Sequence, residues 1–139
     1  MKLVGIDIAK YEHAAFIMEA STGESLCDPF FFKNNKEGFK TLYTELNKYS
    51  KNELLIGMED TGHYNFAIES SLLAEGYKVA LINPITTKSL RKASLKSVKS
   101  DKEDALLITK ALLDKAYYRI ISIQDEKLKE AKELTRYRT

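Results

Sequence analysis

Cysteine, proline and glycine are scarce in this chain, and long apolar runs are missing. Its 139 residues include one cysteine, two prolines and six glycines. The lone Cys27 excludes an intrachain disulfide and a cysteine-cluster metal site, so any bound metal would need oxygen ligands. No segment approaches the roughly eighteen apolar residues of a membrane span, and no signal peptide is visible. We therefore expect a soluble protein of the reducing cytoplasm, without a membrane partner.

Basic residues are concentrated in one part of the chain, although the formal net charge is only +2. The segment from Tyr77 to Ser100 contains no acidic residue. Its basic residues are Lys78, Lys88, Arg91, Lys92, Lys96 and Lys99. The last five of these are typical of contact with a nucleic-acid backbone, and a solvated helix face is the alternative. Because no aromatic residue occurs between Lys78 and Tyr117, backbone contact is favoured over base stacking.

Hydrophobic residues form 44% of the chain, which is enough for one well-buried core. Their spacing predicts strands at residues 2–8, 13–19, 25–33, 54–58 and 77–82. It predicts helices at 35–49, 64–74, 101–113 and 124–139, with a basic helical stretch over 85–99. This order indicates an α/β domain with a five-stranded mixed sheet flanked by helices and followed by a C-terminal helical extension. The last helix reaches Thr139 without a stop signal, so we expect more protein beyond it.

Two acidic residues stand at the carboxyl ends of predicted strands. Asp7 lies in an apolar run, where a charge is costly unless it is paired or bound to a cation. Glu59 follows the apolar residues 54–58 in the same way. If these two strands are parallel neighbours, both carboxylates emerge at the edge where open α/β sheets bind ligands. A local alternative for Asp7 is that it caps the following turn.

Asp101 and Asp104 open a predicted helix. Three residues apart, they lie on one face about one turn apart and can converge on a shared target. The competing interpretation is a capping box, with Ser100 as the cap and Glu103 reaching back. Together with Asp7 and Glu59, the pair would supply four hard oxygen ligands, a set suited to two Mg²⁺ ions, with Mn²⁺ as a substitute. Such metal pairs support phosphodiester transfer.

Four short motifs resemble one family of mobile-element enzymes. They are Gly5-Ile6-Asp7-Ile8-Ala9-Lys10, Met58-Glu59-Asp60-Thr61-Gly62-His63-Tyr64, Asn83-Pro84, and Lys99-Ser100-Asp101-Lys102-Glu103-Asp104-Ala105. Their order and spacing are similar to those of the four-acid (DEDD) insertion-sequence transposases, relatives of the pilin-gene invertases. The resemblance covers almost the whole chain. It implies a fold like that of the RuvC Holliday junction resolvases, within the ribonuclease H class.

The resemblance also implies roles for particular residues and partners. Asp7, Glu59, Asp101 and Asp104 would be the catalytic, metal-binding acids of a DNA strand-transfer enzyme in a bacterial or archaeal cytoplasm. The family has a small residue where this chain has Asp60, and motif position favours Glu59 over Asp60. Residues 1–116 would form the catalytic domain, and 117–139 would begin a helical connector. Family members add a domain with a nucleophilic serine, which these residues do not contain, and some use a structured guide RNA.

Other functions remain open at this point. Gly5-Ile6-Asp7 could also open the first phosphate loop of a sugar kinase or actin-like ATPase. However, the glycines or threonines expected next are replaced by Ala9 and Lys10, and the chain is too short for the paired domains of those enzymes. A junction-resolving nuclease could use the same acids. A non-catalytic module that binds nucleic acid, or that forms a homo-oligomer through the C-terminal helix, is the alternative of another kind.

Overall fold

A computed structural model describes residues 1–61, 64–93 and 101–123. The strands in this part of the chain are β1 (Lys2–Asp7), β2 (Glu12–Glu19), β3 (Phe30–Lys33), β4 (Leu54–Glu59), β5 (Lys78–Ile82) and β6 (Tyr118–Ile121). The helices are α1 (Lys36–Leu46), α2 (Phe66–Ala74), α3 (Pro84–Ala93) and α4 (Asp101–Ala111), with short 3-10 turns η1 (Lys51–Glu53) and η2 (Lys115–Tyr117).

The strands form a single mixed sheet of six in the described residues, in the order β3-β2-β1-β4-β5-β6. A hairpin joins β1 to β2, and β3 continues it in antiparallel fashion. The central strands β1, β4 and β5 are parallel, so their carboxyl ends share one edge. The condition for Asp7 and Glu59 to emerge at one edge is thus met, because the first and fourth strands are parallel neighbours.

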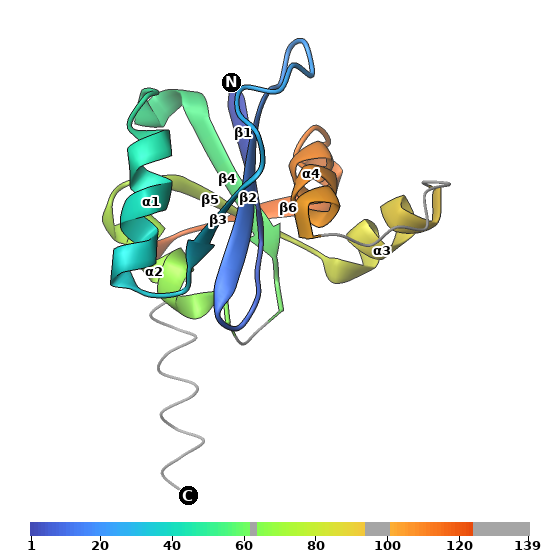
Figure 1. Cartoon of the computed structure of the whole chain (residues 1–139). Coiled ribbons are helices and arrows are strands. Elements are labelled where there is room, and N and C mark those ends of the chain that lie inside the picture. The colour runs from blue at the N-terminus through green and yellow to red at the C-terminus, as the bar shows by residue number, and fades with distance from the viewer. Residues whose placement is uncertain (62–63, 94–100, 124–139) are drawn as a thin grey trace, which may run out of the picture.

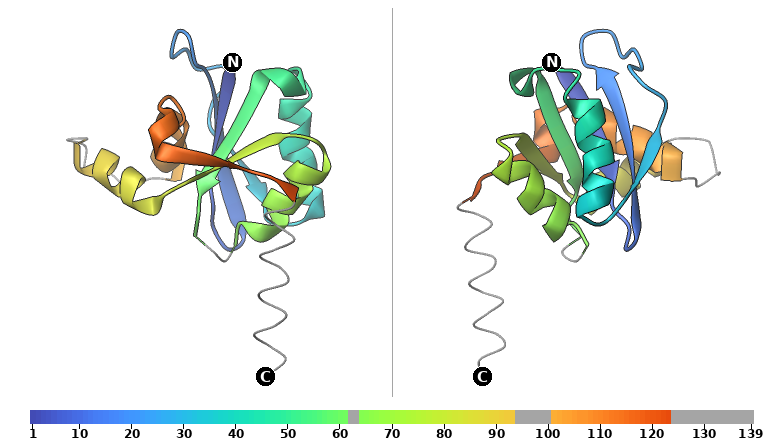
Figure 2. Two further views of the ribbon diagram at one scale, coloured as in Figure 1. Left: turned by 180° about the vertical axis from the view of Figure 1, so that it is seen from behind. Right: turned by 60° about the vertical axis from the view of Figure 1, so that its left-hand side comes forward.

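Helices cover both faces of this sheet, as Figures 1 and 2 show. On one face α1 and α2 bury Leu42, Leu46, Ile68 and Leu72 against the central strands. On the other face α4 packs across β1, β2 and β4, and α3 lies beside it. Each strand of the centre is therefore buried on both sides, which explains why β1 and β4 have nearly continuous apolar sequences.

The boundaries follow local signals in the sequence. Asn35 caps α1 by accepting a hydrogen bond from the Gly38 backbone N–H at 2.7 Å. Gly76 takes a positive φ of 85° just after α2, which is the backbone conformation that stops the helix before β5. In the described ranges, no helix is long and apolar enough to cross a membrane.

The prediction of five strands was wrong by one. β6 pairs antiparallel with β5 and comes from residues assigned above to the helical extension. It is a short edge strand of which only Ile121 is buried, so its own sequence carries little strand pattern. The third predicted strand is also shorter than expected, since its first half forms only an isolated bridge between Met18 and Ser25. The predicted helix at 124–139 lies outside the described residues.

Candidate active site

Two parallel strands end in the same pattern, Leu-x-Gly-x-acid. It spans residues 3–7 in β1 and 55–59 in β4, and the register pairs Gly5 with Gly57. Leu3 and Leu55 belong to the core under α4, so alternation along the strands turns Asp7 and Glu59 toward α4 as well. Asp7 and Glu59 thus stand side by side at the carboxyl edge.

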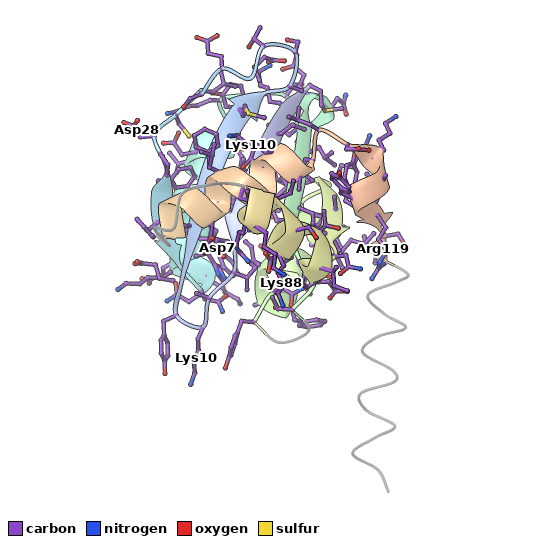
Figure 3. The ribbon with its side chains drawn as sticks, turned by 90° about the vertical axis from the view of Figure 1, so that its right-hand side faces the viewer. Asp7, Lys10, Asp28, Lys88, Lys110 and Arg119 are labelled. Atoms are coloured by element: carbon purple, nitrogen blue, oxygen red, sulfur yellow. The ribbon has the colours of Figure 1, made fainter. Side chains whose placement is uncertain are left out.

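The two glycines let α4 approach the sheet closely. A Cβ atom on Gly5 would lie 2.6 Å from the carbonyl oxygen of Ala105 and 2.1 Å from Oγ1 of Thr109. A Cβ atom on Gly57 would lie 2.5 Å from a methyl carbon of Leu112. Because Ala105 lies directly on Gly5, its neighbour Asp104 lies at the edge of the sheet where β1 and β4 end in Asp7 and Glu59. We call this the acidic edge. Figure 3 shows Asp7 beneath the first half of α4.

A guanidinium group from α3 joins two of these acids. Arg91 Nε donates to Oδ1 of Asp104 at 3.1 Å, and Arg91 Nη2 donates to Oε1 of Glu59 at 3.3 Å. The Glu59 and Asp104 side chains are only 16% and 23% exposed. Carboxylates from a strand end and a helix therefore converge on one cation, although they are 45 positions apart in the sequence.

The chemistry of this donor set fits a divalent metal. Asp7, Glu59 and Asp104 offer only carboxylate oxygens, which are the ligands that Mg²⁺ and Mn²⁺ prefer. In this structure the positive charge between Glu59 and Asp104 is the guanidinium group of Arg91. Among the described side chains, no three acids or histidines are gathered closely enough to hold an ion in this conformation. Asp101 begins α4 as predicted, and its side chain lies outside the described part of the site.

The two adjacent acids after β4 have different surroundings. Glu59 contacts Arg91 beneath α4, whereas Asp60 forms an ion pair with Arg119 of β6 at 3.5 Å. The Asp60 side chain is also more open, at 38% exposed. Its backbone N–H donates to the Ile82 carbonyl and extends the ladder to β5. Of the pair, Glu59 is the residue that faces the other acids.

The predicted basic residues divide between two environments. Lys88 and Lys92 are exposed on α3, available to a negatively charged partner. Arg91, between them, is engaged with the acids. Lys96 and Lys99 lie outside the described residues. Figure 3 shows Lys88 and Asp7 on the same side of the molecule.

Buried polar residues hold the loops around this edge, and sequence patterns did not single them out. Asn65 is fully buried and donates through Nδ2 to Oε2 of Glu69 at 3.0 Å, while Thr61 Oγ1 lies 3.5 Å from Asn65 Oδ1. This set links Thr61 to the first turn of α2. An asparagine at the start of a helix was the available signal.

His13 holds the other loop, after β1. It is fully buried, and its Nδ1 accepts a hydrogen bond from the Ala9 backbone N–H at 3.1 Å. Burial lowers the pKa of His13, because the protonated ring would lose its hydration. A neutral His13 thus fixes the turn that follows Asp7, in keeping with a structural role.

The family of the chain follows from its similarity to known proteins. The transposase family model DEDD_Tnp_IS110 matches residues 4–139. The chain belongs to this family of transposases. It is 29% identical over 109 residues to the pilin gene-inverting proteins of Moraxella bovis and Moraxella lacunata, a stretch that covers 77% of the chain. The same stretch covers 33% of each relative, so the transposase chain spans about a third of their length.

The fold of this transposase chain is that of RuvC. A Thermus thermophilus RuvC structure superposes with a TM-score of 0.58 at 12% identity, covering 87% of the chain and 100% of RuvC. A complex of T. thermophilus RuvC with a Holliday junction substrate gives 0.55 at 14% identity, covering 78% and 90%. The expected RuvC-like fold is confirmed.

Proposed function

We propose that this chain is the metal-dependent catalytic domain of a DNA transposase, which cleaves and transfers DNA strands. Its catalytic residues would be Asp7, Glu59, Asp101 and Asp104. The observation that carries the proposal is the meeting of Glu59 and Asp104 on one cation, with Asp7 beside Glu59 on the neighbouring strand. Membership of the transposase family supports the same assignment.

Two structural constraints would hold the acids in place. Asp7 and Glu59 are fixed by parallel strands whose register is set by buried side chains on both faces. Asp104 is fixed by the contact of α4 with Gly5. Two divalent ions bound here would activate the attacking oxygen and stabilise the leaving oxygen of a phosphodiester. The rigid sheet edge would keep the four ligands in place during that exchange.

The DNA backbone would reach the acids along α3. Lys88 and Lys92 are exposed on that helix, and Lys96 and Lys99 follow them in the sequence. The chain would deliver phosphates to the metals by charge rather than by base recognition. Target choice would then rest on partners, for which we infer a structured guide RNA and a second copy of the chain, bound through the C-terminal helix that the sequence predicts.

Calorimetric titration with Mn²⁺ tests the metal site directly. We expect binding to weaken roughly tenfold or more in Asp7→Asn, Glu59→Gln, Asp101→Asn and Asp104→Asn, since even outer-shell partners of metal ligands contribute this much. Asp60→Asn is the matched control, because it removes the adjacent carboxylate without touching the proposed set. Wild-type binding in all four variants would contradict the proposal, and loss in Asp60→Asn alone would reassign the ligand.

A junction-resolving nuclease is the second candidate, favoured by the match to RuvC with a Holliday junction substrate. The same acids would then direct water, and not a DNA hydroxyl, at the phosphodiester. Incubation of the chain with a labelled four-way junction and Mg²⁺ distinguishes the two. Symmetric nicks that disappear when Asp104 is replaced would favour the nuclease. If the junction stays intact although the chain binds metal normally, the result would favour a transposase domain that needs its partners for cleavage.

A further inference from the structure

A hollow of about 420 Å³ opens at the carboxyl ends of β4 and β5, and Asp60, the neighbour of Glu59, is one of its lining residues. Its lining combines residues from three places in the chain: Asp60 after β4, Asn83 and Pro84 at the start of α3, and Tyr117, Tyr118 and Arg119 at the end of η2 and the start of β6. The sixth strand, which the sequence did not predict, and the turn before it bring two tyrosines to this hollow.

The strand register fixes the distance from the hollow to the acids. Glu59 pairs with Ile82, and Ile82 pairs with Tyr118. Glu59 and Tyr118 therefore lie in one row across three strands, about 10 Å apart at strand spacings of roughly 4.8 Å. Tyr118 packs against the same core as the residues under α4, so it shares a face with Glu59. A nucleotide next to one held at the acids is within reach of the hollow.

The lining has the character of a surface that binds a nucleobase. Tyr117 is 38% exposed, which leaves ring surface for stacking, and Pro84 adds an apolar wall. Asn83 uses its Oδ1 to accept from the Ile85 N–H at 2.9 Å, which turns its NH₂ group into the available donor. Asp60 and Arg119 place an acceptor and a donor together at the rim. Stacking faces with a few polar groups are what an unpaired base requires.

We propose that this hollow binds an unpaired nucleobase of the DNA strand whose phosphate lies at the acids. The site rests on the proposed DNA function and adds base stacking to a domain for which the sequence indicated backbone contact alone. Tyr117 is the stacking residue, and Asp60 and Arg119 contact the edge of the base. The two adjacent acids at the end of β4 would then contact the same DNA strand in different ways. Glu59 would bind the metals at the phosphate, and Asp60 would contact the base.

Binding to two oligonucleotides of equal charge tests the site. The ligands are a fluorescent single-stranded DNA and an abasic strand of the same length, measured by anisotropy at one salt concentration. We expect the wild type to prefer the strand with bases by about fivefold to tenfold. Tyr117→Ala should abolish the preference and Tyr117→Phe should keep it. Phe31→Ala is the matched control, since Phe31 is also 38% exposed but lies on β3 at the opposite edge.

A cross-linking experiment on the unaltered chain gives an independent readout. An oligonucleotide with 5-iodouracil should cross-link on irradiation to the peptide that contains Tyr117 and Tyr118, identified by mass spectrometry. Cross-links confined to other peptides would overturn the base site. Equal affinity for both strands would overturn it too and leave the proposed DNA function standing, whereas no binding to either strand would overturn both.

Discussion

Arg91 donates a hydrogen bond from Nε to Oδ1 of Asp104 at 3.1 Å, while its Nη2 contacts Glu59 at 3.3 Å. The proposed metal ligands are thus paired with a cation supplied by the chain itself. Without such a charge, carboxylates brought together would repel each other. Because the guanidinium occupies the space between Glu59 and Asp104, a divalent ion that binds both must displace it.

Loss of Arg91 should therefore strengthen metal binding. The Arg91 side chain is 35% exposed, so we discount its ion pairs to about 0.5–1 kcal/mol and expect Arg91→Gln to bind Mn²⁺ about twofold to fivefold more tightly. The same variant should melt at a lower temperature without metal, a loss that added Mn²⁺ reverses. Lys88→Gln, which removes one charge from an exposed site on the same helix, is the control. Weaker binding in Arg91→Gln would mean that Arg91 stays beside the ions.

Much of this edge could be predicted from local sequence. Apolar runs that end in an acid indicated both the strands and the emergence of Asp7 and Glu59 together. The choice between Glu59 and Asp60 was also available, since the repeated Leu-x-Gly-x-acid pattern puts only Glu59 on the face of Asp7. The position of Arg91 could not be predicted, because its contacts depend on how α3 and α4 pack. The residues next to an arginine in the sequence do not indicate which helix it will face.

The sixth strand could not be predicted from local sequence either. Residues 118–121 are too few to display a period, and their extended conformation results from pairing with β5. Because the sequence predicts no strand over 118–121, it does not place Tyr117 and Arg119 at the acidic edge. The sequence favours backbone contact over base stacking because no aromatic residue lies between Lys78 and Tyr117, although the fold brings two tyrosines to this edge.

Gly5 should tolerate no side chain. A Cβ atom there meets backbone atoms of α4, namely the Ala105 oxygen at 2.6 Å and the Thr109 nitrogen at 2.5 Å. We expect Gly5→Ala to lower the free energy of unfolding by about 3 kcal/mol, because α4 must move as a whole. Chemical denaturation with urea measures the change.

Gly57 provides the matched comparison for Gly5. The three atoms nearest to its Cβ would all belong to the side chain of Leu112, which can change its rotamer, so Gly57→Ala should cost about 1 kcal/mol. Equal losses in the two variants would mean that the approach of α4 to β1 is not the limiting contact. Because Asp104 is carried by α4, Gly5→Ala should also weaken Mn²⁺ binding in whatever fraction remains folded.

Exposed lysines on α3 should govern the salt dependence of DNA binding. Each phosphate contact that is lost lowers the slope of log affinity against log salt by about 0.7–0.9. We expect that decrease in Lys88→Ala and again in Lys92→Ala, with little change in preference between DNA sequences. Lys110→Ala is the control, since Figure 3 shows Lys110 toward the other end of α4 from Asp7. An unchanged slope in both α3 variants would show that DNA follows another path.

His13 should make the fold sensitive to mild acid. Its pKa is lowered from the ordinary value of 6.5 by burial, so below about pH 6.5 the unfolded chain takes up a proton that the folded chain resists. Stability is then fully present above that pH and decreases as the pH falls toward the lowered pKa. His13→Asn can keep an acceptor for the Ala9 N–H without titrating, so its stability should depend less on pH between 6.5 and 5. If urea denaturation gives parallel pH profiles for the two proteins, protonation of His13 does not contribute to the acid sensitivity of the fold.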